Sequence, residues 1–197
     1  MNLEIFREIA SGRPGLVLCT VIQVKGSAPR HVGSRMLSGP EGLITGSIGG
    51  GLGEATALAA GREALASRRS VVLEVEMQGT EVEGTEMVCG GLSRVLVEPS
   101  PSPATYQALL ERVASGERTL LVKSVATGET ALLGGNGEWL SDGPQTLEPS
   151  TALRVLDAGR ATLAAGSELF LDPVLPPEKL LILGGGHVGR ALAAITP

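Results

Sequence analysis

Residues 42–66 read GLITGSIGGGLGEATALAAGREALA, and this stretch decides most about the fold. Its first part, residues 42–48, favours a short strand, and the alanine-rich run 54–66 favours a helix with Leu58 and Leu65 on its apolar face. The triple glycine between the two parts is typical of a tight turn. We therefore predict a strand, a glycine turn and a helix in succession, which is a building unit of an α/β fold.

Glycines at the start of a helix can create a binding site for an anion. Because they lack a Cβ, Gly49, Gly50 and Gly51 would leave their backbone N–H groups open to a ligand, and the helix dipole attracts negative charge. Ser47 adds a hydroxyl donor beside them. Two simpler explanations remain open. The glycines could serve only the turn, and Glu54 could only stabilise the first helical turn through the dipole.

Regular structure is expected on both sides of this unit. The apolar residues of about the first dozen positions recur at helical spacing, and β-branched residues bounded by glycine predict a buried strand over 15–24. Further elements are expected after the central helix: strands over 71–77 and 93–98, a helix over 103–115, and a hairpin of 119–125 with 129–133.

The composition excludes several classes of function. Aromatic residues make up 2% of the chain and the net charge is -5, whereas nucleic-acid binding needs aromatic platforms or clustered cations. No stretch approaches the roughly 18 consecutive apolar residues of a membrane helix, and the N-terminus does not resemble a signal peptide. We expect a cytoplasmic protein with no nucleic-acid or membrane partner.

A cationic glycine-rich loop precedes the central unit. Residues 26–35 read GSAPRHVGSR, where glycine, proline and serine prevent regular structure. Arg30 and Arg35 could each donate charge-assisted hydrogen bonds to an anion, and Arg offers the stronger bidentate kind. His31 is expected to be a solvated loop residue rather than a ligand.

The two cysteines, Cys19 and Cys89, differ in their surroundings. Cys89 lies in the sequence MVCGG over 87–91, where neighbouring backbone N–H groups can lower the pKa of a thiol toward the reactive thiolate. A buried structural thiol is the alternative for Cys89, and it is the expected state of Cys19 inside the strand over 15–24. The chain has no C-x-x-C or H-x-x-x-H spacing, so we expect no metal ligated directly by the protein.

The C-terminal part combines a linker with a nucleotide-binding signature. Residues 172–178 are rich in proline and predict a linker. After it, KLLILGGGHVGRA predicts a strand running into a G-x-G-x-x-G turn at Gly184, Gly186 and Gly189 and then a helix, which is the dinucleotide-binding fingerprint. The acidic ribose-binding residue expected about 20 positions later is absent from the sequence. A NAD(P)-dependent oxidoreductase is therefore the leading alternative function, but this fragment is not expected to bind NAD(P).

Four segments together resemble the XdhC/CoxI family in identity, order and spacing: GSAPRHVGSRML, GSIGGGLGE, MVCGG and LLILGGGHVGRALA. The resemblance covers about 1–98 and returns at 179–194. It implies an accessory protein that binds the molybdenum cofactor (molybdopterin), assists its sulfuration with a cysteine desulfurase and inserts it into a molybdenum hydroxylase resembling xanthine dehydrogenase. The family's motif residues map onto Gly26, Ser27, Pro29, Arg30, Gly33, Ser47, Gly49, Gly50, Gly51, Glu54, Cys89, Gly90 and Gly91.

The resemblance also sets the expected architecture. It implies a mixed α/β N-terminal domain over 1–171, the linker over 172–178 and the incomplete start of a Rossmann-like domain over 179–197, in a protein that forms a homodimer. The chain departs from the family at Leu52, where many members have a cysteine after the triple glycine. The expected function is that of a maturation factor rather than a catalyst. A structural or regulatory hydroxylase subunit that holds no cofactor is a further alternative.

Overall fold

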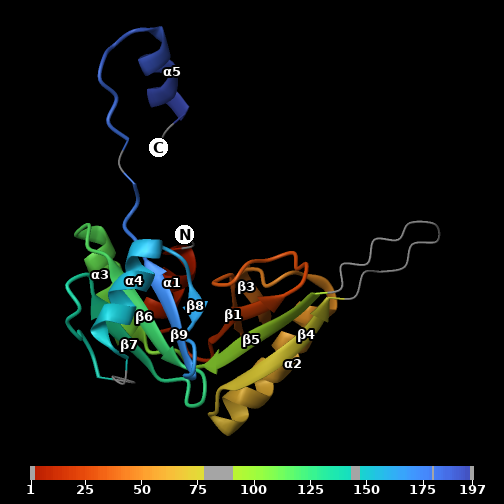
Figure 1. Ribbon diagram of the computed structural model, residues 1–197. Helices are drawn as coiled ribbons and strands as arrows, with labels where there is room; N and C mark the ends of the chain where they lie inside the picture. The colour runs from red at the N-terminus through yellow and green to blue at the C-terminus, as the bar shows by residue number, and fades with distance from the viewer. Residues whose placement is uncertain (1–2, 78–90, 143–146, 179, 196–197) are drawn as a thin grey trace.

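The computed structural model describes residues 3–77, 91–142, 147–178 and 180–195. Within them the chain forms two antiparallel sheets that stand side by side, with helices packed on their faces (Figure 1). The five-stranded sheet has the order β3-β2-β1-β5-β4, and the four-stranded sheet has the order β7-β6-β9-β8. The mixed α/β class expected from the sequence is confirmed.

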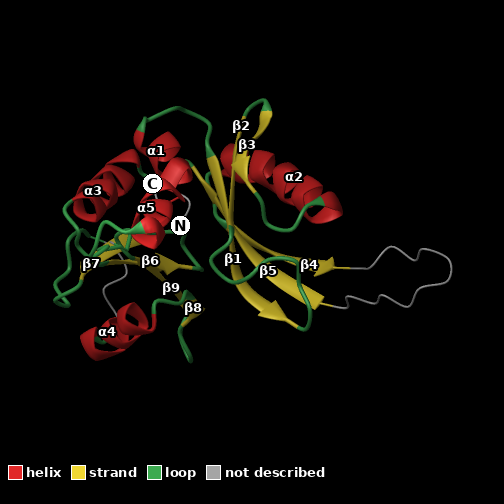
Figure 2. Ribbon diagram, turned by 90° about the horizontal axis from the view of Figure 1, so that it is seen from above, coloured by secondary structure: helices red, strands yellow, loops and turns green. Residues whose placement is uncertain are grey.

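The first sheet contains the central unit of the sequence. Its elements are β1 (Val17–Lys25), β2 (Arg35–Gly39), β3 (Gly42–Gly46), β4 (Val71–Met77) and β5 (Gly91–Pro99), and α2 (Gly51–Ser67) covers one face (Figure 2). Successive strand residues point to opposite faces, so Val17 and Cys19 of β1 lie in the α2-facing core. Gly61 allows this close packing, because a Cβ there would lie 3.2 Å from Val17 Cγ1.

The second sheet lies between helices on both of its faces. Its strands are β6 (Thr119–Ser124), β7 (Thr130–Gly134), β8 (Thr162–Leu163) and β9 (Leu169–Val174). Helices α1 (Leu3–Ala10) and α3 (Pro103–Ala114) pack together on one face, and α4 (Pro149–Ala158) covers the other (Figure 2). Ser102 caps α3 by accepting a hydrogen bond from Thr105 N, and Pro103 takes the first helical position.

A buried ion pair joins the two sheets. Lys123 of β6 is fully buried, and its ammonium donates hydrogen bonds to both carboxylate oxygens of Glu98 of β5, at 2.8 and 2.6 Å, and to the hydroxyl of Tyr106 at 3.0 Å. Burial by itself would lower the pKa of Lys123, but Glu98 and Tyr106 outweigh that effect and raise it above its ordinary value. Ile22 and Leu96 of the first sheet also share an apolar cluster with Phe170 of the second. The two sheets therefore form one packed body.

Most predicted elements are confirmed, with small shifts of their ends. The helix expected over 54–66 begins earlier, at Gly51, because the glycine turn itself enters the helix. The second half of the second sheet was missed: α4, β8 and β9 were not predicted. Strand β9 extends to Val174, so residues 172–174, assigned to the linker from their composition, belong to the sheet instead.

The strand predicted at 179–183 is not formed in residues 180–183. Leu181 and Leu183 are 80% and 89% exposed, and no described strand pairs with this segment. A strand without a neighbour leaves its backbone groups to the solvent, so the apolar sequence alone does not hold it extended. The helix that was expected next is present as α5 (His187–Ile195), which stands apart from both sheets (Figure 1). Among the described helices, none is long and apolar enough to cross a membrane.

Candidate binding cleft

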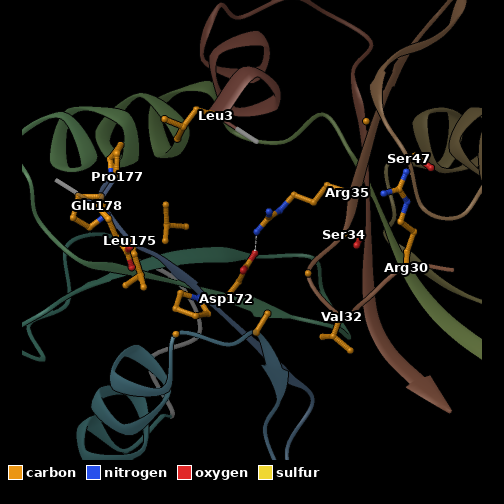
Figure 3. Close-up of a pocket in the computed structure, with 17 residues that line it drawn as sticks. Leu3, Arg30, Val32, Ser34, Arg35, Ser47, Asp172, Leu175, Pro177 and Glu178 are labelled. Atoms are coloured by element: carbon orange, nitrogen blue, oxygen red, sulfur yellow. Dashed lines mark hydrogen bonds and ion pairs between the residues drawn. The ribbon is translucent and has the colours of Figure 1, made fainter. Parts of the chain in front are cut away.

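A cleft of about 950 Å³ opens between the two sheets (Figure 3). One wall comes from the cationic loop and from β2 and β3, and the other from β9 and the segment that follows it. Four of the residues singled out from the sequence line it: Arg30, Gly33, Arg35 and Ser47. Residues 30–47 therefore meet residues 159–178 in one cavity, whereas the sequence had indicated candidate binding residues only in the first of these two segments.

The loop reaches the cleft because it folds back onto β1. Val21 N donates to the carbonyl oxygen of Ser34 at 2.9 Å, and Gly33 N donates to that of Val21 at 2.8 Å. Gly33 has a φ of +88°, and a Cβ there would lie 3.1 Å from Ala161 Cβ in the second half of the chain. Glycine is therefore required both by the backbone conformation and by the closeness of the second sheet.

Arg30 is the exposed cation of the cleft. Its side chain extends along the loop and points toward Ser47 at the end of the opposite strand (Figure 3). Within the described part of the chain, no ion pair of Arg30 with a carboxylate is recorded. Its guanidinium provides hydrogen-bond donors for an anionic group.

Arg35 and Asp172 form an ion pair at the bottom of the cleft. The side chain of Arg35 crosses from β2 to β9 and is 10% exposed, while that of Asp172 is 5% exposed (Figure 3). The guanidinium also lies over the ring of Phe6, 4.9 Å from its centre. The sequence indicated Arg35 as an additional cation but missed Asp172, whose only signal is a carboxylate in the otherwise apolar run LFLDPV.

The glycine turn before α2 holds an anion, but this anion is the chain's own Glu54. Its Oε1 accepts hydrogen bonds from Ser47 Oγ at 2.7 Å, Gly50 N at 2.9 Å and Ile48 N at 3.1 Å. Partial burial would raise the pKa of Glu54, but the hydrogen bonds from Ser47 and the turn outweigh it and hold the pKa below its usual value. The N–H groups expected to bind a phosphate are thus partly used within the protein.

Backbone conformation explains the triple glycine directly. Gly49, Gly50 and Gly51 have φ values of +139°, +81° and +57°, a region that L side chains rarely adopt. A Cβ at Gly50 or Gly51 would meet nothing within 4 Å, so the outer side of the turn is open. The turn stands next to the cleft through Ser47, but the three glycines do not line it.

The third motif lies against the first one. A Cβ on Gly91 would be 2.0 Å from the carbonyl oxygen of Ser27, so only glycine lets β5 begin at this point. Gly26 turns the chain there with a φ of +74°, and Pro29 is exposed. None of these residues lines the cleft. Cys89 and Gly90 lie outside the described residues, and the predicted role of Cys89 stays a prediction.

The other cysteine is a buried thiol, as expected. Cys19 is 0% exposed, and burial, assisted by the charge of Glu98, raises its pKa to about 12. A thiol with such a pKa is protonated at neutral pH and is a poor nucleophile. In the described part of the chain, no group of three or more His, Cys, Asp or Glu residues could hold a metal ion.

The predicted nucleotide loop has the tight turn that its fingerprint requires. A Cβ on Gly189 would lie 2.5 Å from the carbonyl oxygen of Gly184, and Gly184 has a φ of +115°. Gly186 lies just before α5 and accepts a hydrogen bond at its carbonyl oxygen from Arg190 N, at 3.0 Å. The loop lies apart from both sheets (Figure 1), and none of its residues lines the cleft.

Comparison with known proteins agrees with the motifs. The chain is similar to a crystal structure described as a xanthine dehydrogenase from Bacillus halodurans, with a TM-score of 0.71 and 18% sequence identity over 90% of this chain and 53% of that one. The chain thus spans about half the length of that protein, and the likeness concerns the fold. No curated protein gives a significant match. Residues 9–76 match the model of the XdhC and CoxI family, which is the family that the motifs indicated.

Proposed function

We propose that this protein binds the molybdenum cofactor in the cleft between its sheets and delivers it to a molybdenum hydroxylase that resembles xanthine dehydrogenase. The observation that carries the proposal is the position of Arg30 and Ser47. Both belong to motifs inside the segment that matches the XdhC/CoxI family model, and both line the same cavity although a strand pair separates them in the sequence. A maturation factor of this family needs such a site for its cargo.

The residues present fit the cofactor in size and charge. Ligand pockets commonly enclose about 300–1,000 Å³, and the cleft of about 950 Å³ lies at the upper end of that range. The pterin of the cofactor carries a phosphate, and a phosphate is bound well by guanidinium donors. Arg30 would hold that phosphate at the mouth of the cleft, beside Ser47, whose own hydroxyl proton is donated to Glu54. Deeper in the cavity, Arg35 has a buried Nε with no hydrogen-bond acceptor, which indicates a place for a polar ligand group.

The bound cofactor would supply the molybdenum chemistry, while the residues of this chain bind, orient and shield it. The hydroxylase apoprotein, a cysteine desulfurase and a second copy of the chain are partners that the family resemblance suggests, and they are part of this proposal. Cys89 would serve as a thiolate near the cofactor.

An anaerobic titration with the isolated cofactor tests the proposal. Retained cofactor is measured after desalting by the fluorescence of its oxidised pterin, for the wild type and for R30A, C89S and R62A. Arg62 is an exposed arginine on α2 that does not line the cleft, so R62A is the matched control. We expect stoichiometric retention by the wild type and R62A.

The two test variants should bind more weakly. Loss of a charge-assisted hydrogen bond, about 1.5–3 kcal/mol, corresponds to roughly 10- to 150-fold weaker binding by R30A. C89S should also retain less cofactor, because it lacks the thiolate that we propose for Cys89. No retention by the wild type, or equal retention by R30A and R62A, would contradict the assignment of the cleft.

The tight turn at Gly184 and Gly189 keeps dinucleotide binding as the second candidate function. We expect no binding when this chain is titrated with NADH and NADPH and their intrinsic fluorescence is followed. Saturable binding that G189A abolishes would favour an oxidoreductase, because a side chain at Gly189 would collide with the turn.

A further inference from the structure

The bottom of the cleft holds a hydrogen-bond donor and an acceptor side by side. Arg35 comes from β2 of the first sheet and Asp172 from β9 of the second, and Figure 3 shows their side chains meeting in the cavity. Both side chains are at least nine-tenths buried. A ligand in the cleft would therefore meet a guanidinium and a carboxylate that are already oriented by each other.

Part of this pair's hydrogen-bonding capacity is unused. A guanidinium has five N–H donors, and among the described residues the only recorded acceptor for Arg35 is Asp172 Oδ2, which accepts from Nη2. Its Nε is buried without an acceptor. The ring of Phe6 covers one face of the guanidinium, so free donors can reach a ligand only along its edge.

The carboxylate also has free capacity on the side of the loop. No described residue donates to Asp172 Oδ1, and a carboxylate offers about four lone-pair positions. Gly33 lies near this oxygen and has no side chain that could donate to it. Because Asp172 lines the cleft, a ligand in the cleft can donate to this oxygen.

We propose that Arg35 and Asp172 recognise the 2-amino-4-oxopyrimidine edge of a pterin ring. Asp172 accepts hydrogen bonds from the 2-amino group and the adjacent ring N–H, and Arg35 donates to the 4-oxo group. A carboxylate beside a guanidinium matches this donor, donor, acceptor pattern. The inference rests on the proposed function, because it assigns the ring-binding end of the same cleft in which Arg30 would hold the phosphate.

Guanine carries the same edge as pterin, so the source of the ring has to be distinguished. Binding is measured by fluorescence titration with pterin and with lumazine, which has a 2-oxo group in place of the 2-amino group. Guanosine and inosine monophosphate form a second pair that differs only in the 2-amino group, and they are titrated as competitors of pterin.

We expect the wild type to bind pterin at least about tenfold more tightly than lumazine, because lumazine places an oxygen against the carboxylate. If the wild type also prefers guanosine monophosphate to inosine monophosphate, the site extends to guanine nucleotides. If it does not, the site is restricted to pterins. Both results support recognition of the edge. Equal affinity for pterin and lumazine, or no binding of either, overturns the inference.

Two variants separate recognition from a merely structural ion pair. D172N removes the negative charge with little change of shape and should abolish the preference for pterin, whereas D157N, in the exposed pair with Arg118, should preserve it. A D172N protein that keeps the full preference overturns the role of Asp172. If D172N does not fold, R35K is tested instead, because it keeps a positive charge opposite Asp172. R35K should bind pterin about tenfold more weakly while preserving the preference for pterin over lumazine. Unchanged affinity of R35K for pterin overturns the inference.

The outcome of this test is distinct from that of the proposed function. Retention of the molybdenum cofactor together with equal binding of pterin and lumazine would reject the ring contacts and leave the carrier function intact. Loss of both would reject the cleft as a cofactor site.

Discussion

Replacing Lys123 with methionine should show how strongly the buried ion pair holds the two sheets together. Lys123 is fully buried, and the side chain of Glu98 opposite it is 4% exposed. In K123M the methionine fills most of the space of the lysine, but the Glu98 carboxylate loses its ammonium partner in a site closed to water. Among the described residues, the Thr130 hydroxyl then remains as the hydrogen-bond donor to Glu98, at 3.4 Å.

The expected cost follows from leaving one charge buried without its partner. Breaking a buried ion pair from one side costs about 3–5 kcal/mol, which for a domain of this size lowers Tm by roughly 6–20 °C. The double variant K123M/E98Q removes both charges, and its amide oxygen can still accept the hydrogen bond that the Thr130 hydroxyl donates to Glu98. It should therefore recover most of the loss, with a coupling energy of about 2–3 kcal/mol between the two positions.

Urea unfolding followed by circular dichroism measures these free energies, with K25M at the exposed Lys25 as the control. Because the pKa of Lys123 is raised in the folded protein, its stabilisation is complete below the unfolded pKa of about 10.4 and is lost as the pH rises through the folded value. The wild type should lose stability at high pH more steeply than the double variant. A loss below about 1 kcal/mol in K123M, or a double variant as unstable as the sum of the single ones, would refute the reasoning.

Three further predictions concern the glycine turn, the third motif and the buried thiol. E54Q should lower the free energy of unfolding by about 1–2 kcal/mol at pH 7, because a neutral amide accepts more weakly from the turn. The pKa of Glu54 is lowered in the folded state, so the difference in unfolding free energy between E54Q and the wild type should vanish as the pH falls through the folded pKa. Urea unfolding at a series of pH values measures this difference, and a difference that stays constant would contradict the prediction. G91A should be destabilised by more than about 2 kcal/mol in the same assay, since its Cβ would collide with the Ser27 carbonyl, whereas G185A, with nothing within 4 Å, should be neutral. In C89S, Cys19 should react with a thiol reagent only at the rate of unfolding, and rapid native labelling would show that it is not buried.

Local patterns were sufficient for the elements that keep a strong periodicity. The strand over 15–24, the central helix, the hairpin and the helix after Pro103 were all predicted close to their observed ends, since their apolar spacing matches the structure in which they are buried. Helix α4 was missed although Pro149 marks its start and Gly159 its end. Strand β9 was missed because the proline at 173 indicated a linker rather than a strand. A proline is tolerated in β9 although the strand lies inside its sheet.

Local sequence was sufficient to identify the glycine motifs, the cation Arg30 and the match of residues 9–76 to the XdhC/CoxI family model, because each depends on residues that are neighbours in the chain. What those motifs face could be seen only in the folded chain. There, Glu54 occupies the expected phosphate cradle, and Asp172 meets Arg35 across 137 positions of sequence. Such contacts depend on how the two sheets pack against each other. That packing is set by the sum of many long-range apolar contacts, which no local pattern in the sequence records.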